Sequence, residues 1–67
     1  MGFRDARISA GLSVSQVMKN LRVSDAAVYQ WETGVTRPTA KRLLEVARLY
    51  GCTVDDLLRQ EDRKENA

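Results

Sequence analysis

Residues 13–34, which read SVSQVMKNLRVSDAAVYQWETG, restrict the possible folds more than any other part of the chain. Ser13 lies three residues before Gln16, the spacing of a capping box at the start of a helix. Ser24 is a second N-cap residue, and Gly34, which can take a positive φ, is suited to ending a helix. The segment therefore predicts two short helices joined by a turn too tight to contain another element.

Apolar residues recur at helical spacing in both helices, and this spacing predicts which side of each helix faces the core. The predicted inward residues are Val17, Met18 and Leu21 in the first helix and Ala27, Val28 and Trp31 in the second. The predicted outward residues of the second helix are Ala26, Tyr29, Gln30 and Thr33. Because Trp31 shares its face with Val28, its indole ring is predicted to lie in the core rather than to stack on a ligand.

The rest of the chain predicts three more helices and no strand, because no segment alternates between apolar and polar residues with period two. Residues 3–10 form a helix that Gly11 ends, and Pro38 and Thr39 open a fourth helix that Gly51 stops. The apolar residues of this fourth helix are Leu43, Val46, Ala47 and Tyr50. All of these segments favour a helical bundle.

A second capping box, formed by Thr53 and Asp56, starts a fifth helix. Its apolar residues are Val54, Leu57 and Leu58. The prediction is an all-α, compact five-helix domain over residues 1–59, with the helix-turn-helix pair at 13–33. Residues 60–67, QEDRKENA, are polar throughout and are predicted to be a frayed tail.

The charge of the chain is small but unevenly distributed. Residues 1–50 contain eight basic and four acidic side chains, a net +4, whereas residues 51–67 contain three basic and five acidic ones, a net −2. A basic body suits a polyanionic partner, although solubility alone explains this excess nearly as well. We expect a cytoplasmic protein without membrane contact, because the chain has no long apolar run and its N-terminus carries charges where a signal peptide needs apolar residues.

Enzymatic function is not expected from this composition. The chain has no His, and its single cysteine, Cys52, suits a small buried hydrophobe better than a nucleophile. No residues have metal-ligand spacing, and no glycine-rich phosphate loop is present. We therefore expect no cofactor, no metal and no small-molecule ligand.

The order GLS–(x)9–VSxxxVxxWExG–(x)3–P, followed by GCTVDDLL, resembles the lambdoid repressor and Cro/CI-type helix-turn-helix family, also called XRE. The resemblance extends without a gap from about Arg7 to Leu58. It implies a lambda-repressor-like fold and a sequence-specific transcriptional regulator, most simply a repressor, that binds the major groove of double-stranded DNA. It also implies a homodimer on a pseudo-palindromic operator and a bacterial or phage origin, with the protein on the nucleoid when bound.

The resemblance implies that the helix at residues 24–32 reads base edges through its outward residues. Gln30 can bond adenine through two hydrogen bonds, Ala26 can contact a thymine methyl group, and Asp25 can accept from cytosine N4. Asp25 has an alternative explanation, since an acid in the first turn of a helix is stabilising without any ligand. Tyr29 fits either a contact in the groove or a contact at its rim.

The resemblance also implies two groups of phosphate contacts, one at the start of the second helix and one after the recognition helix. These predicted residues are Ser13, Ser15, Gln16, Thr33, Thr36, Arg37, Lys41 and Arg42. The alternative is that the basic residues form an ordinary solvated face.

Two further implications concern structural roles. Arg7 and Glu32 are expected to form a partly buried ion pair, while Leu57 and Leu58 of the fifth helix are expected at a dimer interface. The chain departs from the family at Val14, where a Gln that contacts the DNA backbone is usual. It also departs at Arg22, in a turn that usually has Gly or Asn because of its positive φ.

A competing hypothesis is a protein-interaction module, such as an antitoxin or an accessory subunit, that keeps the fold and binds DNA weakly. Val14, Asp25 and the acidic tail motivate it.

Overall fold

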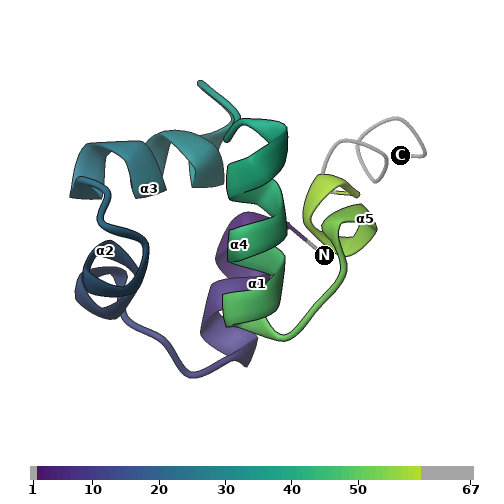
Figure 1. Ribbon diagram of the computed structural model, residues 1–67, viewed down its shortest axis with the longest axis horizontal. Helices are drawn as coiled ribbons and strands as arrows, with labels where there is room; N and C mark the ends of the chain where they lie inside the picture. The colour runs from purple at the N-terminus through teal and green to yellow at the C-terminus, as the bar shows by residue number, and fades with distance from the viewer. Residues whose placement is uncertain (1, 60–67) are drawn as a thin grey trace.

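A computed structural model of the protein describes residues 2–59, and every regular element in this range is helical (Figure 1). The helices are α1 (Phe3–Ser9), α2 (Val14–Leu21), α3 (Asp25–Thr33), α4 (Ala40–Tyr50) and α5 (Val54–Leu58). The predicted all-α fold of five helices is confirmed, and α1 ends one residue earlier than predicted. The predicted tail at residues 60–67 lies outside the described residues. Within the described range, no helix has the length and apolar character needed to cross a bilayer.

Local hydrogen bonds at the helix starts explain why the boundaries follow from the sequence. The Ser13 hydroxyl accepts from the backbone N–H of Gln16 at 3.1 Å, and the Gln16 side chain accepts from the backbone N–H of Ser13 at 2.8 Å. Thr53 and Asp56 form the same reciprocal pair, and these bonds from Thr53 lower the pKa of the Asp56 carboxyl. Each box satisfies N–H groups that the helix itself leaves without partners.

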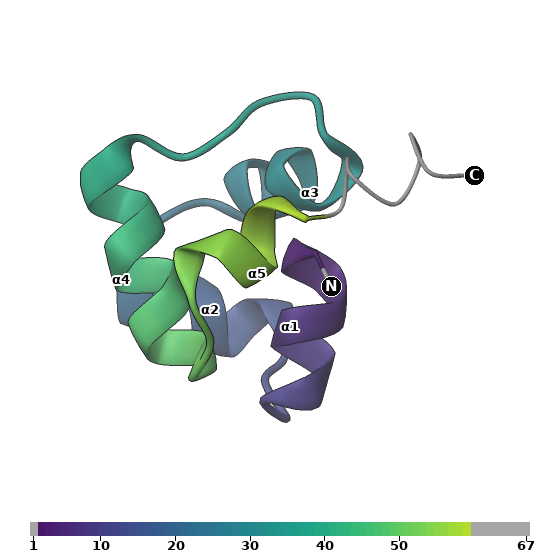
Figure 2. The same cartoon turned by 90° about the vertical axis from the view of Figure 1, so that its right-hand side faces the viewer.

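The five helices enclose one small core. Helix α1 packs against α3, α4 and α5, and α2 packs against both α3 and α4 (Figure 2). The buried apolar residues come from all five helices: Phe3, Ala6, Val17, Leu21, Val28, Trp31, Val46, Ala47, Tyr50 and Leu57. The rings of Phe3 and Trp31 lie with their centroids 6.3 Å apart, so the first and third helices meet through aromatic side chains.

The burial pattern confirms the inward face predicted for the helix-turn-helix pair. Val17, Leu21 and Val28 are buried, and Trp31 is only 7% exposed, so the indole belongs to the core. Met18 and Ala27 are partly buried and pack against the same core. Cys52 also packs there, and burial raises the pKa of its thiol, which keeps the thiol protonated at neutral pH.

The predicted dimer contact at Leu57 is wrong. This side chain is 0% exposed, because α5 has only five residues and uses Leu57 to close the core over α1 and α4. Leu58 is partly buried and packs on the edge of the same core.

The turn between α2 and α3 contains Arg22 in the left-handed conformation, with φ 58° and ψ 48°. It is the one residue other than glycine with a positive φ among residues 2–59. Its backbone N–H still donates to the carbonyl of Met18, and so does that of Val23 at 3.2 Å. The turn therefore has the geometry expected of the family, and an L-residue occupies it at a cost of about 1 kcal/mol.

Replacing Arg22 with Gly should raise the free energy of unfolding by about 0.5 to 1 kcal/mol, because Gly adopts this conformation without strain but loses more chain entropy on folding. The measurement is urea denaturation followed by circular dichroism. Arg22→Ala is the matched control, since it removes the guanidinium and keeps the strain. An equal gain in both variants would mean that charge, rather than backbone conformation, sets the effect.

Candidate nucleic-acid interface

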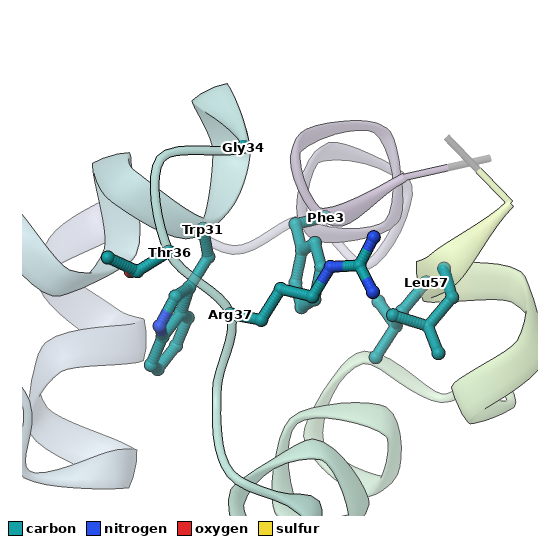
Figure 3. A pocket seen from close by; sticks show the side chains of 7 residues that line it. Phe3, Trp31, Gly34, Thr36, Arg37 and Leu57 are labelled. Atoms are coloured by element: carbon teal, nitrogen blue, oxygen red, sulfur yellow. The ribbon is translucent and has the colours of Figure 1, made fainter. Parts of the chain in front are cut away.

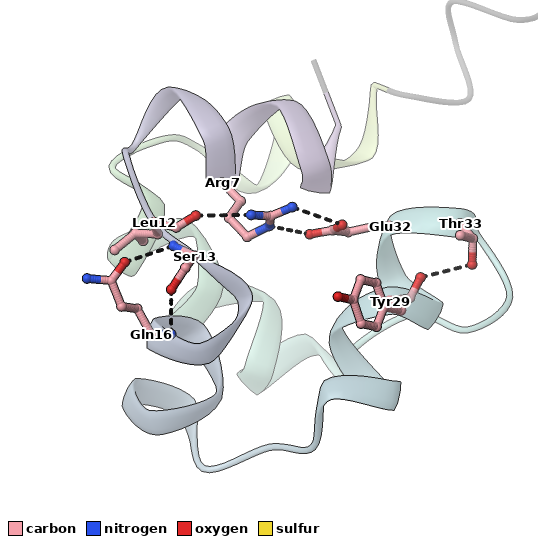
Figure 4. Close-up of polar contacts among 7 residues, drawn as sticks. All are labelled: Arg7, Leu12, Ser13, Gln16, Tyr29, Glu32 and Thr33. Atoms are coloured by element: carbon pink, nitrogen blue, oxygen red, sulfur yellow. Dashed lines mark hydrogen bonds and ion pairs between the residues drawn. The ribbon is translucent and has the colours of Figure 1, made fainter.

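An ion pair between Arg7 on α1 and Glu32 on α3 fixes the third helix against the first (Figure 4). The Nε of Arg7 donates to Glu32 Oε2 at 2.6 Å, and Nη2 donates to Oε1 at 3.4 Å. A third donor, Nη1, reaches the carbonyl of Leu12 at 3.0 Å. The two side chains are 12% and 5% exposed, and the hydrogen bond that Arg7 donates to Glu32 raises the pKa of Arg7. The pair expected from the family resemblance is therefore present and joins α1, the loop after it and α3.

The phenol of Tyr50 lies in the same part of the core. Burial raises its pKa from 10.0 to about 12, and the negative charge of Glu32 acts in the same direction. Its buried hydroxyl has no hydrogen-bond partner among residues 2–59. The folded protein therefore favours the neutral phenol, and ionisation of this group opposes folding.

Helix α3 has an exposed outward face, and its inner side is fixed to the rest of the protein. Val28 and Trp31 anchor its inner side in the core, and Glu32 anchors its C-terminal half. The four predicted base-reading residues, Asp25, Ala26, Tyr29 and Gln30, are all exposed. Tyr29 alone has a large exposed apolar surface there, with 51% of its area accessible. This face can enter a groove without rearrangement of the core.

Two of the predicted phosphate ligands have their hydroxyl protons engaged elsewhere. Thr33 Oγ1 donates to the carbonyl of Tyr29 at 2.9 Å, and Thr36 Oγ1 donates to Gln30 Oε1 at 3.4 Å (Figure 4 shows the first). A hydroxyl group has one proton, so neither group can donate to a phosphate while these bonds are made. In this arrangement the threonines serve α3 and the loop after it rather than the DNA backbone.

The start of α2 provides donors of a different kind. The first backbone N–H groups of a helix have no partner inside the helix, and they favour an anion. Ser13 keeps its hydroxyl proton, because in the capping box its oxygen only accepts, and Ser15 is exposed beside it. Gln16 keeps its amide N–H groups, since its Oε1 makes the cap. Val14 is partly buried against the core and contributes no donor side chain.

Arg4 is a basic residue beside this surface that the sequence interpretation did not select. It lines an open hollow formed by α1, the start of α2 and α3, together with Val14, Tyr29 and the ion pair of Arg7 and Glu32. Arg4 is exposed and lies three residues before Arg7, one helical turn away on the same side of α1. The three-residue spacing of Arg4 and Arg7 was the sequence feature from which this position could have been predicted.

The cations after α3 differ in their surroundings. The Nη1 of Arg42 donates to the carbonyl of Leu21 at 2.9 Å and to Glu45 at 2.8 Å, so this side chain supports the turn between α2 and α3. These two bonds favour a structural role for Arg42 over the predicted contact with a phosphate. Lys41 is exposed at the start of α4.

Arg37 extends between Phe3 and Leu57, toward α5 (Figure 3). It lines a cavity of about 20 Å³ with Phe3, Trp31, Gly34, Thr36, Leu57 and Leu58. Such a cavity holds a water molecule at most, so it is not a ligand site. Its position shows instead that the loop after α3 lies directly on the core.

One of three comparisons with known proteins found a match, and it agrees with the helical fold. The family model described as helix-turn-helix matches residues 3–57, from the start of α1 to the buried leucine of α5. Searches among curated proteins and among solved structures each found no match.

Breaking the buried ion pair should destabilise the protein strongly. Arg7→Met or Glu32→Leu leaves one buried charge without its partner, which costs about 3 kcal/mol and removes most of the stability that a core this small supplies. The double variant removes both charges and should recover much of this loss. The measurement is a double-mutant cycle by thermal unfolding. Asp55→Asn, which breaks the exposed pair with Arg59, should change stability by less than about 1 kcal/mol. An equally small effect of Arg7→Met would contradict the structural role.

Tyr50 should make the protein sensitive to alkaline pH. Its folded pKa of about 12 lies above the ordinary value of 10.0, so its contribution is complete below pH 10 and is lost as the pH rises to 12. Tyr50→Phe should match the wild type within about 1 kcal/mol at neutral pH, because the deleted hydroxyl has no hydrogen-bond partner in the described part of the chain. Above pH 10 the variant should lose less stability than the wild type. Tyr29→Phe changes an exposed tyrosine and is the control; its loss of stability above pH 10 should equal that of the wild type. Identical profiles of stability against alkaline pH for all three proteins would contradict this role of Tyr50.

Proposed function

Because the chain belongs to the XRE-type helix-turn-helix family, we propose that it is a sequence-specific transcriptional regulator that binds double-stranded DNA. One observation carries the proposal. Helix α3 is anchored through its inner face and through Glu32, while its outward residues are exposed on a surface that fits the major groove.

In this proposal Gln30 is the main base reader, with an amide that can form two hydrogen bonds to adenine. Ala26 offers a methyl group to thymine, and Tyr29 contacts either the groove or its rim. Asp25 accepts from cytosine where a cytosine lies opposite, and it also stabilises the start of α3 without DNA.

The phosphate contacts are proposed for the start of α2 and for the cations around the recognition helix. Ser13, Ser15 and Gln16 supply donors at one side, and Arg4 adds a cation beside them. Arg37 and Lys41 belong to the second group, at the other side of α3. Arg42 is left out of this set because it braces the turn.

A repressor that acts as a cytoplasmic homodimer is the simplest form of this function. One recognition helix covers few base pairs, and two chains related by a twofold axis place their helices about 34 Å apart on a pseudo-palindrome. Leu58 is still a proposed contact between chains, whereas Leu57 is not, because the core encloses it.

The second candidate is a protein-interaction module with weak DNA binding. Val14 supports it, because it provides no side-chain donor at the start of α2, and the engaged hydroxyls of Thr33 and Thr36 reduce the number of phosphate contacts further.

Selection from random-sequence duplexes at low salt tests the first candidate. We expect enrichment of a pseudo-palindrome by the wild type. Gln30→Ala should lower discrimination at one base pair of each half-site by about 1 to 3 kcal/mol without changing the salt dependence. Lys41→Ala should weaken binding to all duplexes and reduce the slope of log K against log salt by about one.

Arg48→Ala is the matched control, because Arg48 is an exposed cation in the last turn of α4, away from the proposed contacts. It should leave the salt slope unchanged. Enrichment of no duplex at low salt would refute the regulator and favour the interaction module.

A further inference from the structure

The backbone carbonyl of Gln30 joins the end of α3 to the loop that follows. It accepts from the backbone N–H groups of Gly34, of Val35 at 2.9 Å and of Thr36 at 3.4 Å. Gly34 can make this closure because it has φ 82°, which an L-residue rarely adopts. The loop therefore folds back over the last turn of the helix and places Thr36 beside Gln30.

The side chains of these two residues are also joined. Thr36 Oγ1 donates to Gln30 Oε1 at 3.4 Å. The amide of Gln30 then keeps two N–H donors and one further acceptor site on its oxygen. These are the groups that bond the N7 and N6 positions of adenine. The contact with Thr36 thus holds the amide without using the groups that a base edge requires.

The loop that contains Thr36 contacts the core. The loop lies on the core at Trp31 and Phe3, with Thr36 and Arg37 at the same small cavity (Figure 3), and Pro38 is buried. An exposed glutamine on a helix without such a neighbour samples many rotamers and must lose this freedom on binding. A fixed hydroxyl beside the amide reduces the number of rotamers before DNA arrives.

From these contacts we infer that Thr36 is a positioning residue that sets the base preference of Gln30. The inference rests on the proposed DNA-binding function and assigns Thr36 a role different from the phosphate contact predicted for it. A phosphate ligand would strengthen binding to every sequence, whereas a positioning residue strengthens discrimination at the one base pair that Gln30 reads.

Two variants separate these roles. Thr36→Val keeps the shape of the side chain and removes the hydroxyl, and Thr36→Ser keeps the hydroxyl. The measurement is the ratio of two dissociation constants: that of the duplex changed at the base pair that Gln30→Ala identifies, divided by that of the selected duplex. Since the hydrogen bond is long, Thr36→Val should lower this ratio by about 3-fold, near the lower end of what one net hydrogen bond contributes. Thr36→Ser should restore the ratio, and Thr36→Val should have no further effect on it in a Gln30→Ala background.

A uniform loss of affinity for all duplexes in Thr36→Val, with a lower salt slope, would overturn the inference and leave the DNA-binding function intact. Enrichment of no duplex by the wild type would overturn both. A readout without DNA is the order parameter of the Gln30 side-chain amide from ¹⁵N relaxation of the free protein. It should fall in Thr36→Val and stay at the wild-type value in Thr36→Ser; equal order parameters in all three proteins would overturn the inference.

Discussion

The rest of the structure depends on the contact of Arg7 with Glu32. A pair with so little exposure gives up most of its hydration, and its stabilising effect comes from how completely its hydrogen bonds are made. Three donors of the guanidinium reach two oxygens of Glu32 and the carbonyl of Leu12. These bonds have directions that apolar contacts lack, so the pair sets the angle of α3 relative to α1 as well as its distance. Among residues 2–59, α3 contributes two of the buried apolar side chains of the core, Val28 and Trp31, and the hydrogen bonds of Glu32 add directional restraints to this nine-residue helix.

Helix α3 consequently has two separate tasks on its two sides. Its inner side belongs to the core and to the ion pair, and its outer side exposes Asp25, Ala26, Tyr29 and Gln30 to solvent. The loop after Gly34 extends this division, because its backbone closes on Gln30 while Thr36 and Arg37 line the same small cavity as Trp31. The outward face is therefore preorganised from three directions: the core, α1 and the loop. Such preorganisation lowers the entropy cost of binding a rigid partner such as a duplex.

The sequence predicted what depends on neighbouring residues. Ser13, Ser24 and Thr53 start helices through bonds that span three residues, and the helical repeat of apolar residues separates the inner face of α3 from the outer one. What failed depends on distant parts of the chain. The burial of Leu57 follows from how α5 packs on α1 and α4, which its apolar pattern does not specify. The bond from Arg42 to Leu21 crosses 21 positions, so the sequence pattern did not predict that this cation supports the turn between α2 and α3.

The proposed DNA-binding surface consists of the outer face of α3, the start of α2 and the loop after Gly34. Titration of the ¹⁵N-labelled protein with a short duplex, followed by two-dimensional NMR, tests it most directly. If this surface binds DNA, backbone amide shifts should change most at residues 13–16, 25–33 and 34–37, and these changes should diminish as salt is raised. Shift changes centred on α5 and the C-terminal half of α4, or no changes at low salt, would contradict it.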